Sequence, residues 1–210
     1  AAMIFDPAVI SRFADCGVTL LDDPSAVLSM ALLYLGYPAD STDLAQLREV
    51  EDLLAAVRPY IKYFNNSKML LDLPSGEVCL AMCWSGDYAV ANMRGEEAGL
   101  DVDIHYTVPA EGATDWMDNL YIPADAANKD SAYLFVDFMT RPDISARNSN
   151  AVGYANANRS ATPLVNPSIA DDPAIYPDEA IWNRLHESKV FPPKQQRVRT
   201  RSWTRIKSGL

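Results

Sequence analysis

Helical and strand-like patterns of apolar residues alternate along most of the chain. The spacing of apolar positions predicts helices over residues 7–15, 24–35, 41–57, 67–73, 87–97, 129–140, 143–150, 177–187 and 199–207. Short apolar runs bounded by turn residues predict strands over residues 18–21, 78–83, 103–108 and 116–122. Residues 155–174 carry no clear period, and we interpret them as a long ordered surface connection or as a crossover between two lobes. Interleaved helices and short strands indicate an α/β architecture.

Two short tracts each combine a tryptophan with a nearby aspartate. In the first, a strand-like run breaks near Gly86, which separates Trp84 from Asp87 in the first turn of a helix. In the second, Trp116 and Asp118 lie two residues apart in an extended stretch, so both side chains leave the same face. A ring beside a carboxylate suits a cationic, partly apolar ligand, because the carboxylate pairs with an ammonium and the ring covers methylene groups. The alternative for each pair is a core aromatic beside a solvated turn.

The charge of the chain restricts its partners. The 210 residues carry a formal net charge of -10, yet residues 191–210 hold six basic residues and no acid, which leaves 12 basic against 28 acidic residues before them. Such an acidic body repels nucleic acid and attracts small cations. The basic tail fits either a patch for phosphate or anionic lipid, or a segment packed on the acidic body. The second is favoured because Val198, Trp203 and Ile206 interleave with the charges and need burial.

Histidine and cysteine usage excludes several kinds of chemistry. With only His105 and His186, neither near other ligands, zinc sites and Ser-His-Asp catalysis are disfavoured, and no cofactor is expected. No phosphate-binding glycine loop is present. In a reducing compartment Cys16, Cys79 and Cys83 would be free thiols. In an oxidising one we favour a Cys16–Cys79 disulfide, because it ties the first helix–strand unit to the strand before Trp84.

The first five residues have no charged region, no long apolar run and no cleavage site. We therefore expect that they are not a signal peptide. Asp6 and Pro7 follow them immediately as a helix start, so the chain looks as if it were cut from something longer.

Several segments carry a resemblance to a known family. They are Asp-Cys-Gly-Val at 15–18, the Arg-Pro stretch at 58–64, Gly-Glu-Val-Cys at 76–79, Trp-Ser-Gly-Asp at 84–87, residues 122–130, the Tyr-Ala-Asn-Ala-Asn stretch with its continuation at 154–165, and residues 197–203. In one register over nearly the whole chain, these segments resemble the C-terminal portion of the periplasmic polyamine-binding proteins of ABC importers, the putrescine and spermidine receptors.

The resemblance implies a two-lobe α/β fold of the periplasmic binding protein type II kind, here without the N-terminal part of lobe 1 and the start of lobe 2. It implies that residues 1–97 form the core segment of lobe 2. Residues 98–175 would form a return segment of lobe 1. Residues 176–210 would be a C-terminal helical segment that packs back on lobe 2.

The resemblance also implies roles for individual residues. Trp84 and Trp116 resemble the aromatics that cover the polyamine chain, one from each lobe. Asp87 and Asp118 resemble the carboxylates that pair with its amines, and Tyr154 resembles the tyrosine that closes the aromatic box. These are carried over position by position, and the first two pairs coincide with the tracts identified above.

Three positions depart from the family's pattern. Relatives selective for putrescine commonly carry Glu at the position of Ser25, so Asp22 or Asp23 would have to supply the missing charge. Trp116 replaces the Phe of some putrescine receptors, and its larger ring leans toward spermidine or another long polyamine. Asn66 stands where Ser is common and would either bond to ligand or cap the helix that follows.

The sequence therefore predicts a monomeric polyamine-binding protein, not an enzyme, that works in the periplasm of a Gram-negative bacterium. Its expected partners are the polyamine and the permease subunits of an ABC transporter, with only peripheral docking at the inner membrane. One alternative is a truncated fragment that does not bind. The other is an α/β hydrolase or transferase domain that uses Asp87 or Asp118 as a base.

Overall fold

The computed structural model describes residues 1–208. Its larger body surrounds a three-stranded parallel sheet in the order β2-β1-β3, with β1 at Val18–Leu20, β2 at Ile61–Phe64 and β3 at Leu80–Ala81. Because β1 is central, it is buried at every position. Parallel strands need a crossover, and the helices between β1 and β2 provide it.

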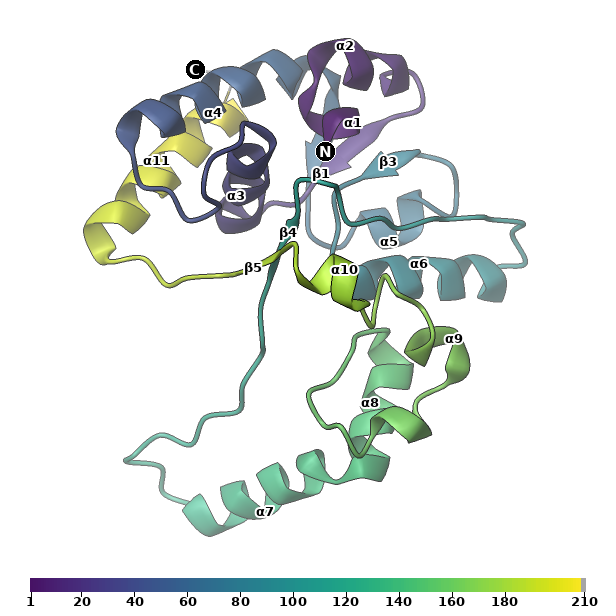
Figure 1. Ribbon diagram of the computed structural model, residues 1–210. Helices are drawn as coiled ribbons and strands as arrows, with labels where there is room; N and C mark the ends of the chain where they lie inside the picture. The colour runs from purple at the N-terminus through teal and green to yellow at the C-terminus, as the bar shows by residue number, and fades with distance from the viewer. Residues whose placement is uncertain (209–210) are drawn as a thin grey trace.

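Helices of the first 97 residues cover this sheet (Figure 1). The short helices α1 and α2 and the 3-10 turn η1 precede β1, at Ala2–Phe5, Pro7–Ile10 and Ser11–Phe13. The crossover then contains α3, α4 and the 3-10 turn η2, at Pro24–Tyr34, Leu44–Val57 and Arg58–Tyr60. Two more helices flank β3, namely α5 at Met69–Asp72 and α6 at Ser85–Glu97. Asp6, Asp23 and Asp43 cap α2, α3 and α4 by accepting from backbone N–H groups of the first turn.

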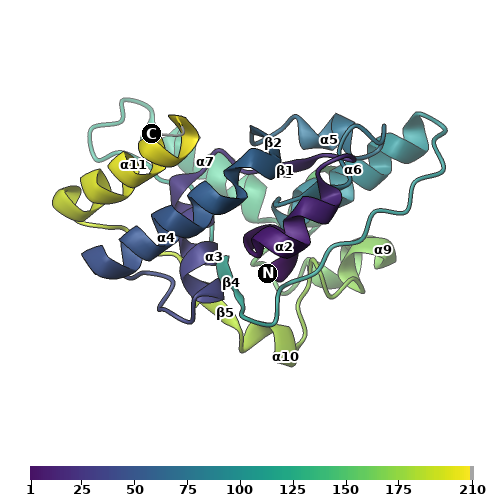
Figure 2. The ribbon, with the colours of Figure 1, turned by 90° about the horizontal axis from the view of Figure 1, so that it is seen from above.

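The C-terminal helix α11, Pro193–Ser208, packs on α3 and α4 and completes the core of the larger body (Figure 2). Trp203 and Ile206 are buried among the apolar residues of that core. Lys207 pairs with Asp22 and Arg205 with Glu51. The prediction that the basic tail packs on the acidic body is therefore confirmed.

A smaller group of helices lies below the larger body in Figure 1. It contains α7 at Lys129–Thr140, α8 at Pro142–Val152, the 3-10 turn η3 at Thr162–Leu164 and α9 at Pro167–Ala170. Ala146, Ala161, Val165, Ile169 and Ile175 form its core. The stretch after α8 is thus an ordered connection, but it also carries η3 and α9 and supplies Ala161, Val165 and Ile169 to this core.

Asparagine side chains hold that connection in place. Asn156 donates to Ser149 Oγ and to the Tyr176 hydroxyl, and Asn158 donates to the carbonyl of Thr140. Their amides replace the backbone pairing that regular secondary structure would supply. This explains a composition rich in Asn without a periodic pattern.

Helix α7 has the periodicity expected from the sequence but buries none of its residues. Tyr133, Leu134 and Phe135 are each more than half exposed. The amphipathic pattern correctly predicted the helix, while the described chain leaves its apolar face uncovered.

Two distant segments meet in a second, two-stranded parallel sheet. Strand β4 at Ala113–Asp115 pairs with β5 at Leu185–Glu187, just after the short helix α10 at Glu179–Trp182. The prediction of one helix over 177–187 is wrong, because its second half is drawn into this pairing. No helix in residues 1–208 is long and apolar enough to span a membrane.

Three strand predictions also need correction. Residues 103–108 and 116–122 form no strand, and regular pairing in the third shrinks to Leu80–Ala81. In contrast, β2 at Ile61–Phe64 was not predicted from the sequence. Short strands are defined by their partners, and the partner of β2 lies more than 40 residues earlier in the chain.

Candidate functional site

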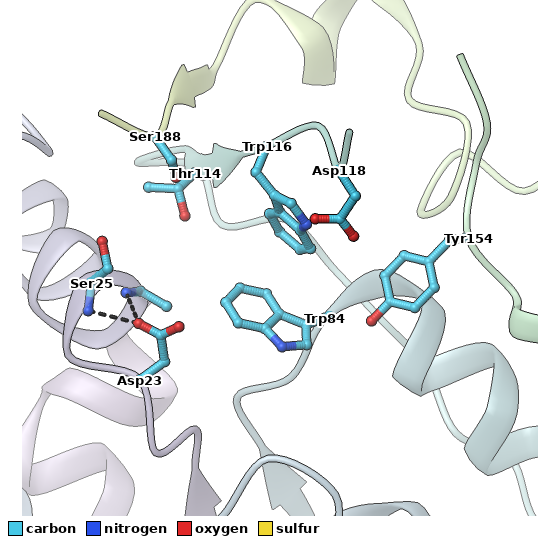
Figure 3. A pocket seen from close by; sticks show the side chains of 9 residues that line it. Asp23, Ser25, Trp84, Thr114, Trp116, Asp118, Tyr154 and Ser188 are labelled. Atoms are coloured by element: carbon cyan, nitrogen blue, oxygen red, sulfur yellow. Dashed lines mark hydrogen bonds between the residues drawn. The ribbon is translucent and has the colours of Figure 1, made fainter. Parts of the chain in front are cut away.

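A cavity of about 470 Å³ opens where the larger body, the β4–β5 pair and the smaller group of helices meet. Its lining comes from five stretches of chain, and the residues are Asp23, Ser25, Ala26, Trp84, Thr114, Trp116, Asp118, Tyr154 and Ser188 (Figure 3). This volume falls in the range typical of small-molecule sites.

Two indoles form the aromatic wall of the cavity. The ring centroids of Trp84 and Trp116 lie 4.4 Å apart with the planes at 65°, an edge-to-face contact. Trp84 is half-buried at the start of α6, whereas Trp116 follows β4 and is 43% exposed. The rings touch each other directly, so they present one continuous apolar surface.

Asp118 supplies a carboxylate next to this wall. Its side chain is exposed, and in Figure 3 it lies beside Trp116 on the side of the cavity that faces Tyr154. A carboxylate at the rim stays hydrated until a ligand arrives. It can therefore pair with a cation without the cost of a permanently buried charge.

Tyr154 reaches the cavity because two glycines allow a close approach. Gly153 ends α8 at φ +72, and a Cβ added there would meet Ala89 Cβ at 2.6 Å. The Tyr154 ring lies directly over Gly86 in the first turn of α6, where a Cβ would meet ring atoms at 2.1 Å. Only residues without a Cβ permit this contact between α6 and the end of α8.

Asp87 lies behind Tyr154 and does not line the cavity. Its Oδ2 accepts the backbone N–H of Trp84 at 3.3 Å, and its Oδ1 accepts the Tyr154 hydroxyl at 3.4 Å. Burial raises the pKa of Asp87, and the hydrogen bonds from Trp84 and Tyr154 oppose that shift. Burial also raises the pKa of Tyr154, with the charge of Asp87 adding to the effect, so the hydroxyl stays a donor.

A disulfide joins Cys16 to Cys79 beside the central strand. It fastens the start of β1 to the segment that leads into β3 and Trp84. Cys83 is not in a disulfide, and burial together with the Asp87 charge raises the pKa of its thiol to about 12. Of the two alternatives for the cysteines, the structure forms the bridge.

The family model of bacterial extracellular solute-binding proteins matches residues 6–177. The chain belongs to this family.

No described group of three or more His, Cys, Asp or Glu side chains is placed to hold a metal ion.

Two relatives named as putrescine-binding periplasmic proteins match nearly the whole chain. The chain is 42% identical over 207 residues to the putrescine-binding periplasmic protein SpuD of Pseudomonas aeruginosa (strain UCBPP-PA14), covering 99% of this chain and 56% of the relative. It is also 42% identical over 208 residues to the putrescine-binding periplasmic protein PotF of Escherichia coli (strain K12), with the same coverage. This solute-binding chain thus spans a little over half the length of these relatives.

A solved structure agrees on the fold. The spermidine/putrescine ABC transporter substrate-binding protein PotD of Streptococcus pneumoniae superimposes with a TM-score of 0.78 at 29% identity, covering 92% of this chain and 58% of that one. The expected α/β fold of the periplasmic binding protein kind is confirmed.

Most of the predicted ligand residues of this solute-binding protein line one cavity, namely Trp84, Trp116, Asp118, Tyr154 and Ser25. Asp87 does not line it, but accepts a hydrogen bond from the hydroxyl of Tyr154, which does.

Asn66 is elsewhere. Its Oδ1 accepts the backbone N–H of Asp22 at 2.7 Å, so it holds the turn before α3. It does not cap the following helix either, because Asn65 accepts from Ser67 and Lys68.

Sequence reasoning missed Thr114 and Ser188, which enter the cavity from β4 and from the end of β5. No sequence signal marks them, since their place depends on the pairing of β4 with β5.

Proposed function

We propose that this solute-binding chain is the polyamine-binding portion of a periplasmic receptor that delivers putrescine or spermidine to an ABC importer. The observation that carries the proposal is a single cavity in which two indoles, a tyrosine and the rim carboxylate of Asp118 converge. Support also comes from relatives named as putrescine-binding periplasmic proteins at 42% identity.

The chemistry of the cavity suits a flexible cation with an apolar middle. An ammonium taken from water needs a carboxylate partner, and Asp118 offers one. Methylene groups recover about 0.8 kcal/mol each when buried, and the continuous surface of Trp84 and Trp116 covers them. A cation over an indole face adds about 0.5–2 kcal/mol.

Asp87 acts, in this proposal, through its neighbours. Because it accepts the Tyr154 hydroxyl and the backbone N–H of Trp84, it holds the Tyr154 ring and the stretch of backbone that carries the Trp84 ring. Its half-buried negative charge is separated from any cation bound against Tyr154 only by the tyrosine side chain.

The lobe assignment is part of the proposal. Residues 1–97 would form the core of lobe 2, residues 98–175 the return segment of lobe 1, and residues 176–210 the segment that packs back on lobe 2. The packing of α11 on α3 and α4 supports it, and so does the separate core of the smaller helical group. Lining residues drawn from both parts suit closure on ligand, which a permease would then recognise.

Isothermal titration calorimetry with putrescine, spermidine and an amino acid without a side-chain amine tests the proposal. Heat with the polyamines only supports the receptor function. Heat with none of them marks a fragment that does not bind, and turnover of an ester or phosphate substrate would instead favour the enzyme alternative.

Two aspartates make a matched pair for the same assay. We expect Asp118→Asn to weaken polyamine binding about 10-fold or more, since a hydrogen-bonded charge is lost. Asp125→Asn removes the same charge from an exposed residue outside the cavity and should change affinity less than 2-fold. Equal effects of the two substitutions would contradict the site assignment.

A further inference from the structure

The basic residues of α11 divide into two groups with different surroundings. The helix carries six basic residues and no acidic one. Three of them serve the fold, namely Arg199, Arg205 and Lys207. Arg199 is 1% exposed and donates hydrogen bonds inside the protein, while the other two pair with carboxylates of the larger body. The remaining three basic residues have no such structural task.

These remaining residues, Lys194, Arg197 and Arg201, form what we call the basic stripe. All three are exposed, and none forms an ion pair or a side-chain hydrogen bond with another residue of 1–208. Their spacing of three and four residues places them on one face of α11, along about 10 Å of its axis. The opposite face buries Trp203 and Ile206 in the core, so the stripe points away from the protein.

The basic stripe is a local positive surface on a chain whose formal net charge is -10. Both ribbon views place α11 at the outer edge of the larger body (Figures 1 and 2). The carboxylates that pair with this helix, Asp22 and Glu51, are already neutralised by Lys207 and Arg205. Salt screens charges beyond about 8 Å at physiological ionic strength. Acidic residues on the far side of the body therefore barely weaken the attraction of the stripe for an anionic surface.

The stripe offers charge without an apolar anchor. Thr204 and Ser208 continue the same exposed face with hydroxyl groups, and no large apolar side chain of α11 is exposed within residues 193–208. A protein partner would bury an apolar core in the interface. A layer of anionic lipid headgroups attracts basic side chains without one. The composition of the stripe consequently fits a lipid surface better than a protein.

We propose that the basic stripe is a surface for reversible adsorption to anionic phospholipid headgroups, which turns α11 toward the membrane. The inference goes beyond the proposed function and does not depend on polyamine binding. Each basic residue near an anionic surface favours adsorption by about 5-fold. Three such residues orient the protein at the surface but do not anchor it there.

Co-sedimentation with vesicles, in the absence of polyamine, tests the inference. The probes are vesicles of phosphatidylcholine alone and vesicles of equal parts phosphatidylcholine and phosphatidylglycerol. We expect adsorption to the second kind only, and its loss when NaCl rises from about 0.05 M to about 0.5 M, because salt screens the attraction. The combined variant Lys194→Gln, Arg197→Gln and Arg201→Gln should lower partition onto the anionic vesicles by about 10-fold or more.

A matched control makes the same charge change away from α11. Arg12, Arg94 and Arg147 are exposed on η1, α6 and α8 and form no ion pair within residues 1–208. Replacing these three with Gln should change partition by less than about 3-fold, because their charges are scattered. Both combined variants should unfold near the temperature of the unsubstituted chain, since every substitution is at the surface.

Several outcomes would overturn the inference. They are no adsorption to anionic vesicles at low salt, equal adsorption to neutral vesicles, and equal losses in the two combined variants. Binding to polyglutamate in solution but not to anionic vesicles would overturn it in favour of an acidic protein partner. Calorimetry with putrescine should give the same affinity for the stripe variant and the unsubstituted chain, so failure of the proposed function is measured separately.

Discussion

Replacing Gly86 with alanine should displace Tyr154 from the cavity. The new Cβ would lie 2.1 Å from two atoms of the Tyr154 ring. Ordinary carbon contacts are about 3.5–4.0 Å, so the ring has to move by about 1.5 Å or swing away. Either movement breaks the hydrogen bond from its hydroxyl to Asp87, which is already 3.4 Å long.

The size of the effect follows from two opposing contributions. Overpacking costs about 1–3 kcal/mol of unfolding free energy, while alanine in place of glycine in a helix returns about 0.5–1 kcal/mol. We expect a net loss of about 1–2 kcal/mol, which for a chain of this size lowers the unfolding temperature by roughly 2–8 °C. Under the proposed function, polyamine affinity should fall as well, because the Tyr154 ring no longer lines the cavity.

A double-mutant cycle with Tyr154→Ala isolates the cause. Thermal unfolding and calorimetric titration are measured for both single variants and for the double variant. The three atoms nearest to the new Cβ all belong to the Tyr154 ring, so without the ring Gly86→Ala should be neutral or slightly stabilising. The reasoning is refuted if Gly86→Ala costs as much stability in the Tyr154→Ala background as in the unsubstituted chain.

Three further predictions concern stability, each measured by urea unfolding. Cys16→Ser removes a disulfide between residues 63 apart in sequence and should lower the unfolding free energy by about 2–4 kcal/mol. An unchanged urea midpoint, in the variant or in the unsubstituted chain after dithiothreitol, would contradict this prediction. Asp22→Asn removes a carboxylate whose pKa is lowered by Lys207, so its contribution exists above the unfolded pKa near 3.8 and is lost as the pH falls through the lower folded pKa. The variant should be about 0.5–1 kcal/mol less stable at pH 7, and the gap should close as the pH falls through the lowered pKa of Asp22, with a pH-independent gap as the opposing result. Leu54→Ala in the core should lower the unfolding free energy by about 2–5 kcal/mol. Leu134→Ala, at a residue 71% exposed, should change it by less than about 0.5 kcal/mol. Similar losses in the two variants would show that the apolar face of α7 is covered.

Sequence patterns were sufficient to predict the longer helices, whose hydrogen bonds join residues close together in the sequence. The helices at Leu44–Val57 and Lys129–Thr140 follow from apolar spacing, because a helix closes its hydrogen bonds within itself. The two tryptophan–aspartate tracts likewise marked Trp84 and Trp116, whose chemistry is visible without coordinates.

Strands and the site depended on contacts between distant residues. Both β2 and β5 exist through partners far along the chain, so their own residues carried little signal, and 185–187 was assigned to a helix. The same pairing brings Thr114 and Ser188 into the cavity.

The roles of similar carboxylates were decided only in three dimensions. Sequence alone determined that this chain is acidic, α/β in pattern and equipped with aromatic–carboxylate tracts. Tertiary packing decided that Lys207 takes Asp22 while Asp23 faces the cavity, and that Asp87 lies beneath Tyr154. The physical reason is that the role of a charge depends on which groups reach it, and those groups come from segments more than 60 residues away in the chain.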